Sequence, residues 1–201
     1  MGRPRKHDAH THGSLVAAAE RLVAEGGPDA LSLRAVAQEA GTTTRAVYSL
    51  FGSKEGLVAA LAQRAYELLH AAAGAIPETD DAVADLVETG VQGFRRFVKG
   101  HPALFRIAFQ RIVPGLRAPA ELSEARERAF DLLAARIRRV QAAGLLGETP
   151  LREALVEFNA MCEGLANAEL RGAVLPILPA GEEEQAWRDS LSTVVRGFRA
   201  R

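Results

Sequence analysis

The chain has 201 residues, of which 48% are hydrophobic and 5% aromatic, and its formal net charge is zero. This length allows one or two apolar cores, and the abundant alanine favours helices over strands. A neutral protein that binds nucleic acid must concentrate its positive groups locally. We find no apolar run long enough to span a membrane and no signal peptide, so we expect a cytoplasmic protein. The single cysteine, Cys162, excludes an intrachain disulfide framework.

The opening segment, MGRPRK, carries Arg3, Arg5 and Lys6 around a proline. Because proline discourages helix, we interpret this segment as a flexible basic arm that contacts the minor groove or the phosphates of DNA. A solvated tail is the alternative. The three histidines between residues 7 and 12 lack the spacing and the acidic or cysteine partner of a metal site, so we expect none. A first helix with one apolar face is predicted over residues 8–25.

Two short helices joined by a turn are predicted between residues 32 and 51. The apolar residues from Leu33 to Ala40 recur at helical spacing, with Ser32 placed to cap the helix and Gly41 to end it. The second helix, capped by Thr42 or Thr43, turns Ala46, Val47, Leu50 and Phe51 inward. Its polar outer face carries Thr44, Arg45, Tyr48 and Ser49. This pattern indicates a helix-turn-helix whose second helix enters the major groove, although a generic helical hairpin would share the turn.

A fourth helix is predicted over residues 53–73, with Ser53 as its N-cap. Lys54 then lies at a helix N-terminus, where backbone N–H groups and an ammonium group converge as in phosphate sites. The alternative is an exposed surface lysine.

The string from Ser32 to Leu57, SLRAVAQEAGTTTRAVYSLFGSKEGL, resembles the DNA-binding domain of the TetR family of bacterial transcriptional regulators. The matching segments are Ser32-Leu33-Arg34, Val36-Ala37, Ala40-Gly41-Thr42-Thr43, Ala46-Val47-Tyr48, Phe51 and Ser53-Lys54-Glu55 with Leu57. One departure is Leu50, which stands where many members carry a histidine often assigned a phosphate contact. The resemblance implies an all-α fold of about nine helices, with a DNA-binding domain over residues 1–53 and a ligand-binding and dimerisation domain over residues 54–201.

Longer helices are predicted in the second part of the chain, over residues 80–99, 120–143, 150–172 and 182–200, with a short one after His101-Pro102. Thr149 is placed to cap the helix at 150–172. The segment from Gly100 to Arg106, GHPALFR, resembles one C-terminal subtype within the same family.

The resemblance implies a homodimer formed through the last two helices, residues 150–172 and 182–200. The final helix carries an apolar stripe of Trp187, Leu191, Val194, Val195 and Phe198. Such a stripe needs a partner, which is either a second copy or the rest of the same chain, and the sequence leaves both open.

The resemblance also implies an apolar pocket for an unidentified small-molecule effector. The candidates for contacting it are Phe105, Phe109, Phe158, Asn159 and Cys162. The polar groups of the helix at 150–172 can equally be surface groups or an interface rim. We find no catalytic motif, and Cys162 on an apolar face is typical of an inert thiol, so we expect neither an enzyme nor a cofactor.

We therefore predict a sequence-specific DNA-binding regulator, a repressor that binds a palindromic operator as a homodimer and is released by a ligand. Thr43, Thr44 and Arg45 are the candidates for base contacts, with Arg45 foremost because a bidentate contact to guanine is the commonest specific pairing. Tyr48 and Lys54, together with Thr43 through its hydroxyl and Arg34 from the preceding helix, are candidates for the DNA backbone, and Ser49 is a further candidate for a DNA contact. The alternative is a helical ligand-binding or scaffold protein that has lost specific DNA binding.

Overall fold

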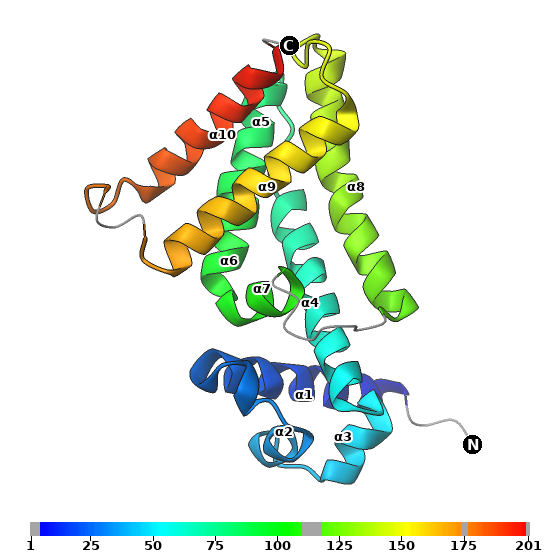
Figure 1. The fold of residues 1–201 in the computed structure, drawn as a ribbon. Helices are drawn as coiled ribbons and strands as arrows, with labels where there is room; N and C mark the ends of the chain where they lie inside the picture. Colours follow the sequence, from blue (N-terminus) through cyan, green and yellow to red (C-terminus); the bar gives the residue numbers. More distant parts are fainter. Residues whose placement is uncertain (1–4, 110–117, 174–176, 200–201) are drawn as a thin grey trace. The chain divides into compact units, whose positions relative to one another are not determined.

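The computed structural model describes residues 5–109, 118–173 and 177–199, with the side chains of residues 5–10 and 28 outside that description. Every regular element in these residues is helical (Figure 1). The elements are α1 (Arg5–Gly26), the 3₁₀ turn η1 (Pro28–Ala30), α2 (Leu33–Glu39), α3 (Thr44–Phe51), α4 (Lys54–Gly74), α5 (Ala82–Glu88), the π-helical segment η2 (Thr89–Arg95), α6 (Arg96–Gly100), α7 (Pro102–Phe109), α8 (Ala120–Ala142), α9 (Leu151–Leu170) and α10 (Glu183–Arg199). With α5, η2 and α6 taken as one continuous helix, the described residues form nine helices, and the predicted all-α fold is confirmed.

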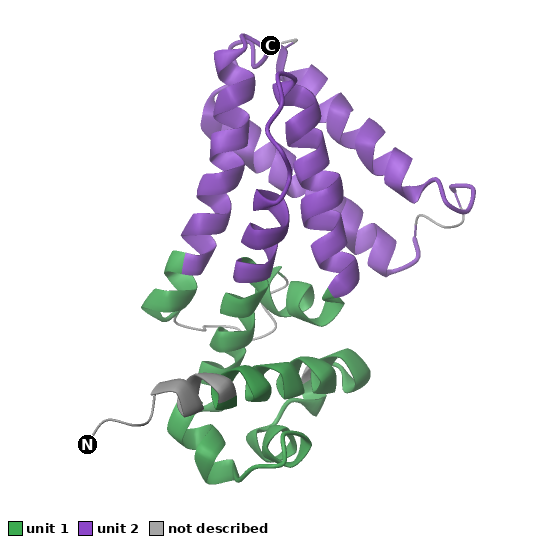
Figure 2. Ribbon diagram, turned by 180° about the vertical axis from the view of Figure 1, so that it is seen from behind, with its two compact units in different colours: residues 1–66, 101–124 green, residues 67–100, 125–201 purple. Residues whose placement is uncertain are grey.

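Contacts divide the chain into two compact units, coloured separately in Figure 2. The first comprises residues 1–66 and 101–124, and so contains α1–α3, the first part of α4, and α7. The second comprises residues 67–100 and 125–201, and contains the end of α4, α5–α6, most of α8, α9 and α10. The division by function at residue 53 stays a prediction.

The first unit is built around α1, which lies across α2 and α3 in Figure 1. Leu15, Ala18 and Ala19 of α1 are fully buried, together with Val36 of α2 and Val47 of α3. Helix α1 begins at Arg5, three residues before the predicted start. The interpretation of residues 5 and 6 as part of a flexible arm is therefore wrong, because a proline just before a helix removes no N–H that the helix needs.

The second unit buries four of the five residues of the apolar stripe of α10 inside its own chain and leaves Val194 half-buried. Trp187, Leu191, Val195 and Phe198 are at most 3% exposed, and α10 packs on α9 and α5. The stripe thus needs no second copy to cover it. On α9 the buried face is Ala154, Phe158, Cys162 and Ala166. Leu151, Leu155 and Leu165 of the same helix are only half-buried.

The π-helical segment η2 was not predicted by the sequence pattern, which indicated one regular helix. Gly90 of this segment lies under the neighbouring helices α9 and α10. A Cβ atom at Gly90 would lie 2.4 Å from Leu191 Cδ1, 3.3 Å from Phe158 Cζ and 3.4 Å from Cys162 Sγ. Glycine is therefore required here for close helix packing.

Thr149 does not cap α9. The N-cap position is Pro150, which makes no side-chain cap hydrogen bond. The Thr149 hydroxyl instead donates to the Phe198 carbonyl oxygen at 3.1 Å, in a buried setting where that carbonyl needs a donor. The predicted cap is wrong because a tertiary hydrogen bond takes the hydroxyl.

Candidate nucleic-acid interface

Helix α2 and the turn after it position the second helix of the pair. The Ser32 hydroxyl accepts the Ala35 N–H at 3.1 Å, which confirms Ser32 as the N-cap. Gly41 follows the helix with φ of 64°, a left-handed conformation that costs glycine little. The Thr42 N–H donates to the Ala37 carbonyl at 2.9 Å, so the chain reverses tightly into α3.

Helix α3 buries one face and exposes the other. Thr43 is its N-cap, and the Thr43 hydroxyl accepts the Ala46 N–H at 3.2 Å. Val47 and Phe51 are buried and anchor the helix on the core. On the opposite side Arg45, Ser49 and Tyr48 are exposed, and Tyr48 keeps 54% of its surface accessible.

This outer face of α3 brings together most of the predicted contact residues. Thr43 is exposed and Thr44 half-buried. The Thr43 hydroxyl oxygen accepts the capping hydrogen bond, which leaves its O–H able to donate to a phosphate oxygen. Large apolar side chains normally lie inside, so the exposed ring of Tyr48 beside a guanidinium fits a surface that meets a partner.

The N-terminus of α4 forms a corner next to α3 that attracts anions. The Ser53 hydroxyl accepts the Gly56 N–H at 3.2 Å, which confirms Ser53 as the N-cap. Lys54 is exposed in the first turn. Hydrogen bonds from the backbone and from Ser53 lower the pKa of Glu55, whose carboxylate suits the positive end of the helix dipole.

Glycine fixes the distance between this corner and α3. A Cβ atom at Gly56 would lie 1.9 Å from the Phe51 carbonyl oxygen, so only glycine allows α4 to start so close to the end of α3. Arg34, the remaining predicted phosphate contact, is exposed on α2. Of the predicted basic arm, Arg3 lies outside the described residues, and Arg5 and Lys6 are described in backbone only, within α1.

Two family models match the chain. The model of bacterial regulatory proteins of the tetR family covers residues 15–61, from α1 into α4. The model of the tetracyclin repressor-like C-terminal domain covers residues 87–194, more than half of the chain. The chain belongs to the TetR family.

Relatives of this TetR-family chain include helix-turn-helix regulators and solved structures. The HTH-type transcriptional regulators Rv1816 of Mycobacterium tuberculosis and Mb1846 of Mycobacterium bovis are each 30% identical over 126 residues, 60% of this chain and 53% of the relative. The match thus spans about half the length of these curated relatives. A structure from Rhodococcus sp. RHA1, described as a protein with unknown function, has a TM-score of 0.77 and 28% identity and covers 93% of this chain and 94% of its own. The structure of the TetR-family regulator PfmR of Thermus thermophilus has a TM-score of 0.66 and 22% identity, and the match covers 90% of this chain and 97% of PfmR. At this low identity the similarity supports the fold alone.

The five predicted effector-contacting residues fall into two separate groups. Phe105 and Phe109 stack with ring centroids 5.2 Å apart in the first unit, where Phe109 also lies 5.3 Å from the ring of Tyr66. Phe158 and Cys162 are buried in the second unit beside Gly90. Asn159 is half-buried on α9 and donates to the Glu163 carboxylate at 2.7 Å. Their role in binding an effector stays a prediction.

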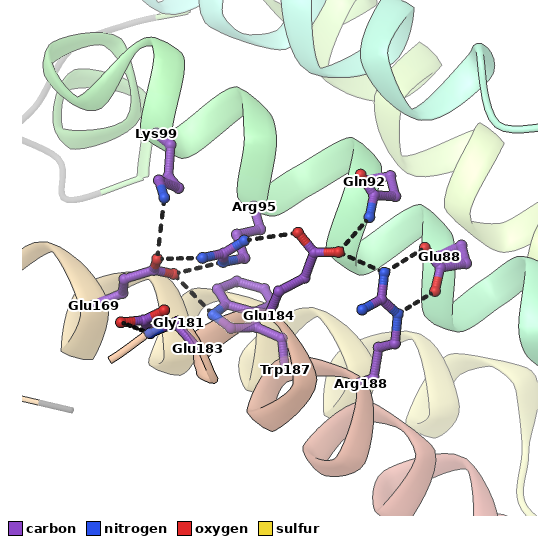
Figure 3. Close-up of polar contacts among 10 residues, drawn as sticks. All are labelled: Glu88, Gln92, Arg95, Lys99, Glu169, Gly181, Glu183, Glu184, Trp187 and Arg188. Carbon is purple, nitrogen blue, oxygen red and sulfur yellow. Dashed lines mark hydrogen bonds and ion pairs between the residues drawn. The ribbon is translucent and has the colours of Figure 1, made fainter. Parts of the chain in front are cut away.

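Sequence reasoning missed a charged network on the side of the second unit where α10 faces α5–α6 (Figure 3). Arg95 of η2, with a side chain 7% exposed, donates to both carboxylate oxygens of Glu169 at 2.9 and 2.7 Å. Glu169 also accepts the Trp187 indole N–H at 2.9 Å. Arg95 falls four residues after the buried Val91 and so lies on the apolar face of the predicted helix. An arginine at such a position indicates a buried charge that needs an acidic partner.

The network continues along α10 through Glu184 and Arg188. The Glu184 carboxylate accepts from Gln92 at 2.9 Å and from Arg188 at 2.6 Å. Arg188 reaches across to Glu88 of α5 at 2.6 Å. The carboxylates at positions 88 and 184 raise the pKa of Arg188 through hydrogen bonds. These bonds fix the register of α10 on the α5–α6 helix.

A second cluster holds the segment between α4 and α5. Asp85, 5% exposed, accepts from the Thr79 N–H at 2.8 Å, the Thr79 hydroxyl at 2.7 Å and Arg139 at 2.5 Å. Burial alone would raise the pKa of Asp85, but these hydrogen bonds outweigh it and lower the pKa to about 2. Arg136 of α8 donates to the Ile76 carbonyl at 2.5 Å. Two arginines of α8 thus clamp this segment onto the unit.

The chemistry of Cys162 fits an inert thiol. The residue is 3% exposed, and burial raises its thiol pKa, so a reactive thiolate is disfavoured. Across residues 5–109, 118–173 and 177–199, no cluster of three or more His, Cys, Asp or Glu side chains is arranged to hold a metal ion. In the same part of the chain, every helix is too short or too polar to cross a membrane.

Proposed function

We propose that this chain is a sequence-specific DNA-binding transcriptional regulator, a cytoplasmic homodimeric repressor that an effector releases from a palindromic operator. The observation that carries the proposal is the outer face of α3. A capped helix, anchored by Val47 and Phe51, presents an exposed arginine, tyrosine and serine on the side away from the core. A helix of this kind suits the major groove, and the family to which the chain belongs supports that use.

The contacts divide into those that read bases and those that hold the backbone. Arg45, exposed in the first turn of α3, is assigned to a guanine edge because residues at the start of a recognition helix reach the bases. Thr43 and Thr44 are further candidates for bases. Tyr48, in the second turn of α3, and Lys54, at the start of α4, are assigned to phosphates.

The dimer is assigned to the outer faces of α9 and α10, since the inner stripe of α10 is used within the chain. Val156 of α9 is 61% exposed, and Gly164 and Gly197 have open space where a Cβ would lie. Small residues with open space above them, and an exposed valine, on these helices would allow two copies to pack closely. A Val156→Asp substitution is expected to give a folded monomer in sedimentation, with weaker operator binding.

The effector is assigned to the second unit, with Phe158, Asn159 and Cys162 as its contacts, and Phe105 and Phe109 in the first unit stay separate candidates. The ligand would favour a conformer whose two recognition helices no longer match half-sites about 34–36 Å apart. By linkage, operator DNA must weaken effector binding by the same factor. The GHPALFR segment, whose Pro102 begins α7, supports assignment to the subtype that carries it.

The test is selection of bound sequences from a random duplex pool at several salt concentrations. Recovery of a palindrome with a steep salt dependence is expected. Arg45→Ala should then lose about 1–3 kcal/mol and the preference at one base pair. Arg34→Ala should weaken all duplexes equally, while Arg138→Ala, at an exposed arginine of α8, should change nothing. Recovery of no motif, with weak and sequence-blind binding, would instead favour a scaffold or ligand-binding protein.

A further inference from the structure

His12 of α1 packs its imidazole ring against Phe51, the last residue of α3. The two ring centroids lie 4.9 Å apart, with the ring planes tilted by 40°. Phe51 is 9% exposed, whereas His12 lies on the solvent-exposed side of α1. The imidazole thus covers the edge of the core while remaining accessible from solvent. Neither the core nor the predicted recognition surface accounts for a histidine at this place.

The ring of Phe51 is a fixed platform. Its backbone carbonyl accepts the Ser53 N–H at 2.7 Å, in a turn where Gly52 adopts φ of 70°. The same carbonyl faces Gly56 so closely that no side chain fits there. The end of α3 and the start of α4 therefore hold one geometry, and the imidazole that packs against Phe51 lies at this end of α3.

The dimensions of DNA indicate what this end of α3 would face. Helix α3 has eight residues and is thus about 12 Å long, close to the width of the major groove of about 12 Å. When the N-terminal residues of such a helix contact base edges, its opposite end lies nearer the phosphate wall of the groove. The end that carries Phe51 is the end away from Arg45, and so faces phosphate rather than base edges.

We propose that His12 is a phosphate-contacting residue, with its imidazole held on Phe51 and an N–H of the ring donating to a phosphate oxygen at the C-terminal end of the recognition helix. This inference rests on the proposed function. Imidazole suits the role because one flat ring can pack on an aromatic platform and still present a polar N–H at its rim. A phosphate contact adds affinity and fixes orientation but reads no sequence.

Three variants test this with two probes, the duplex that the wild-type protein selects from a random pool and a scrambled duplex of equal length and composition. His12→Phe keeps a ring on Phe51 and removes the ring N–H, so it separates packing from phosphate contact. His12→Phe and His12→Ala are expected to weaken binding to both duplexes by the same factor, roughly tenfold, leaving their affinity ratio unchanged. His12→Lys, which restores a donor, is expected to recover most of the loss on both.

Wild-type affinity in His12→Phe would overturn the inference, because the ring contact alone would then suffice. A loss confined to the selected duplex would also overturn it, because that result marks a base contact. Circular dichroism and thermal unfolding of each variant exclude a folding defect as the cause. If the wild-type protein binds neither duplex, the proposed function itself fails, and this inference fails with it. That outcome differs from normal DNA binding by His12→Phe and His12→Ala, which would overturn this inference alone.

Discussion

Arg95 offers a sharp test of the charged network in the second unit. Its guanidinium and the Glu169 carboxylate share two hydrogen bonds, and their side chains are 7% and 15% exposed. Removing one partner of a buried ion pair costs about 3–5 kcal/mol, because the other charge stays desolvated. Glu169 would keep the Trp187 N–H at 2.9 Å and Lys99, 57% exposed, at 3.9 Å. We therefore expect Arg95→Met to cost about 3 kcal/mol, at the low end of that range.

The assay is urea unfolding followed by Trp187, the only tryptophan in the sequence, and by circular dichroism. With a slope of about 2 kcal/mol/M, the expected loss lowers the midpoint by about 1.5 M. The double variant Arg95→Met with Glu169→Gln should recover more than half of the loss, because the remaining amide is neutral and still accepts from Trp187. A single-variant cost below about 1 kcal/mol, or a double variant that merely sums the two single costs, would refute the reasoning.

Three further predictions concern glycines and a carboxylate. Gly90→Ala should cost about 1–3 kcal/mol in thermal unfolding, because its Cβ would lie 2.4 Å from a leucine methyl carbon, whereas Gly13→Ala in α1, with open space, should gain up to about 1 kcal/mol. Gly56→Ala should lower the free energy of unfolding at least as much as Gly90→Ala and should also weaken DNA binding, because its Cβ would lie 1.9 Å from a backbone oxygen. Wild-type stability and wild-type DNA binding would contradict the close packing of α3 on α4. Asp85, with its pKa lowered from 3.8 to about 2, binds a proton more readily when unfolded. The contribution of Asp85 to the free energy of unfolding should thus be complete above about pH 4 and lost as the pH falls towards 2. Asp85→Asn should therefore make the free energy of unfolding depend less on pH over that window.

The capped helix pair and the outer face of α3 could be predicted closely because they depend on local signals. Ser32, Thr43 and Ser53 each cap a helix within three residues of the group they bind, and Gly41 ends α2 through its own backbone conformation. The exposed face of α3 follows from helical periodicity alone. Such signals act over one or two turns, so a short window of sequence contains the whole interaction.

The sequence by itself therefore determined the all-helical class, the capped helix pair and the outward side chains of α3. Only the tertiary structure decided what covers the stripe of α10, why Arg95 is buried, where the Thr149 hydroxyl goes and that His12 lies on Phe51. Thr149 meets its partner 49 residues along the chain, and Arg95 meets Glu169 across 74. The amphipathic pattern shows that a face must be covered, but it carries no information about which distant segment covers it, because hydrophobic burial is not directional.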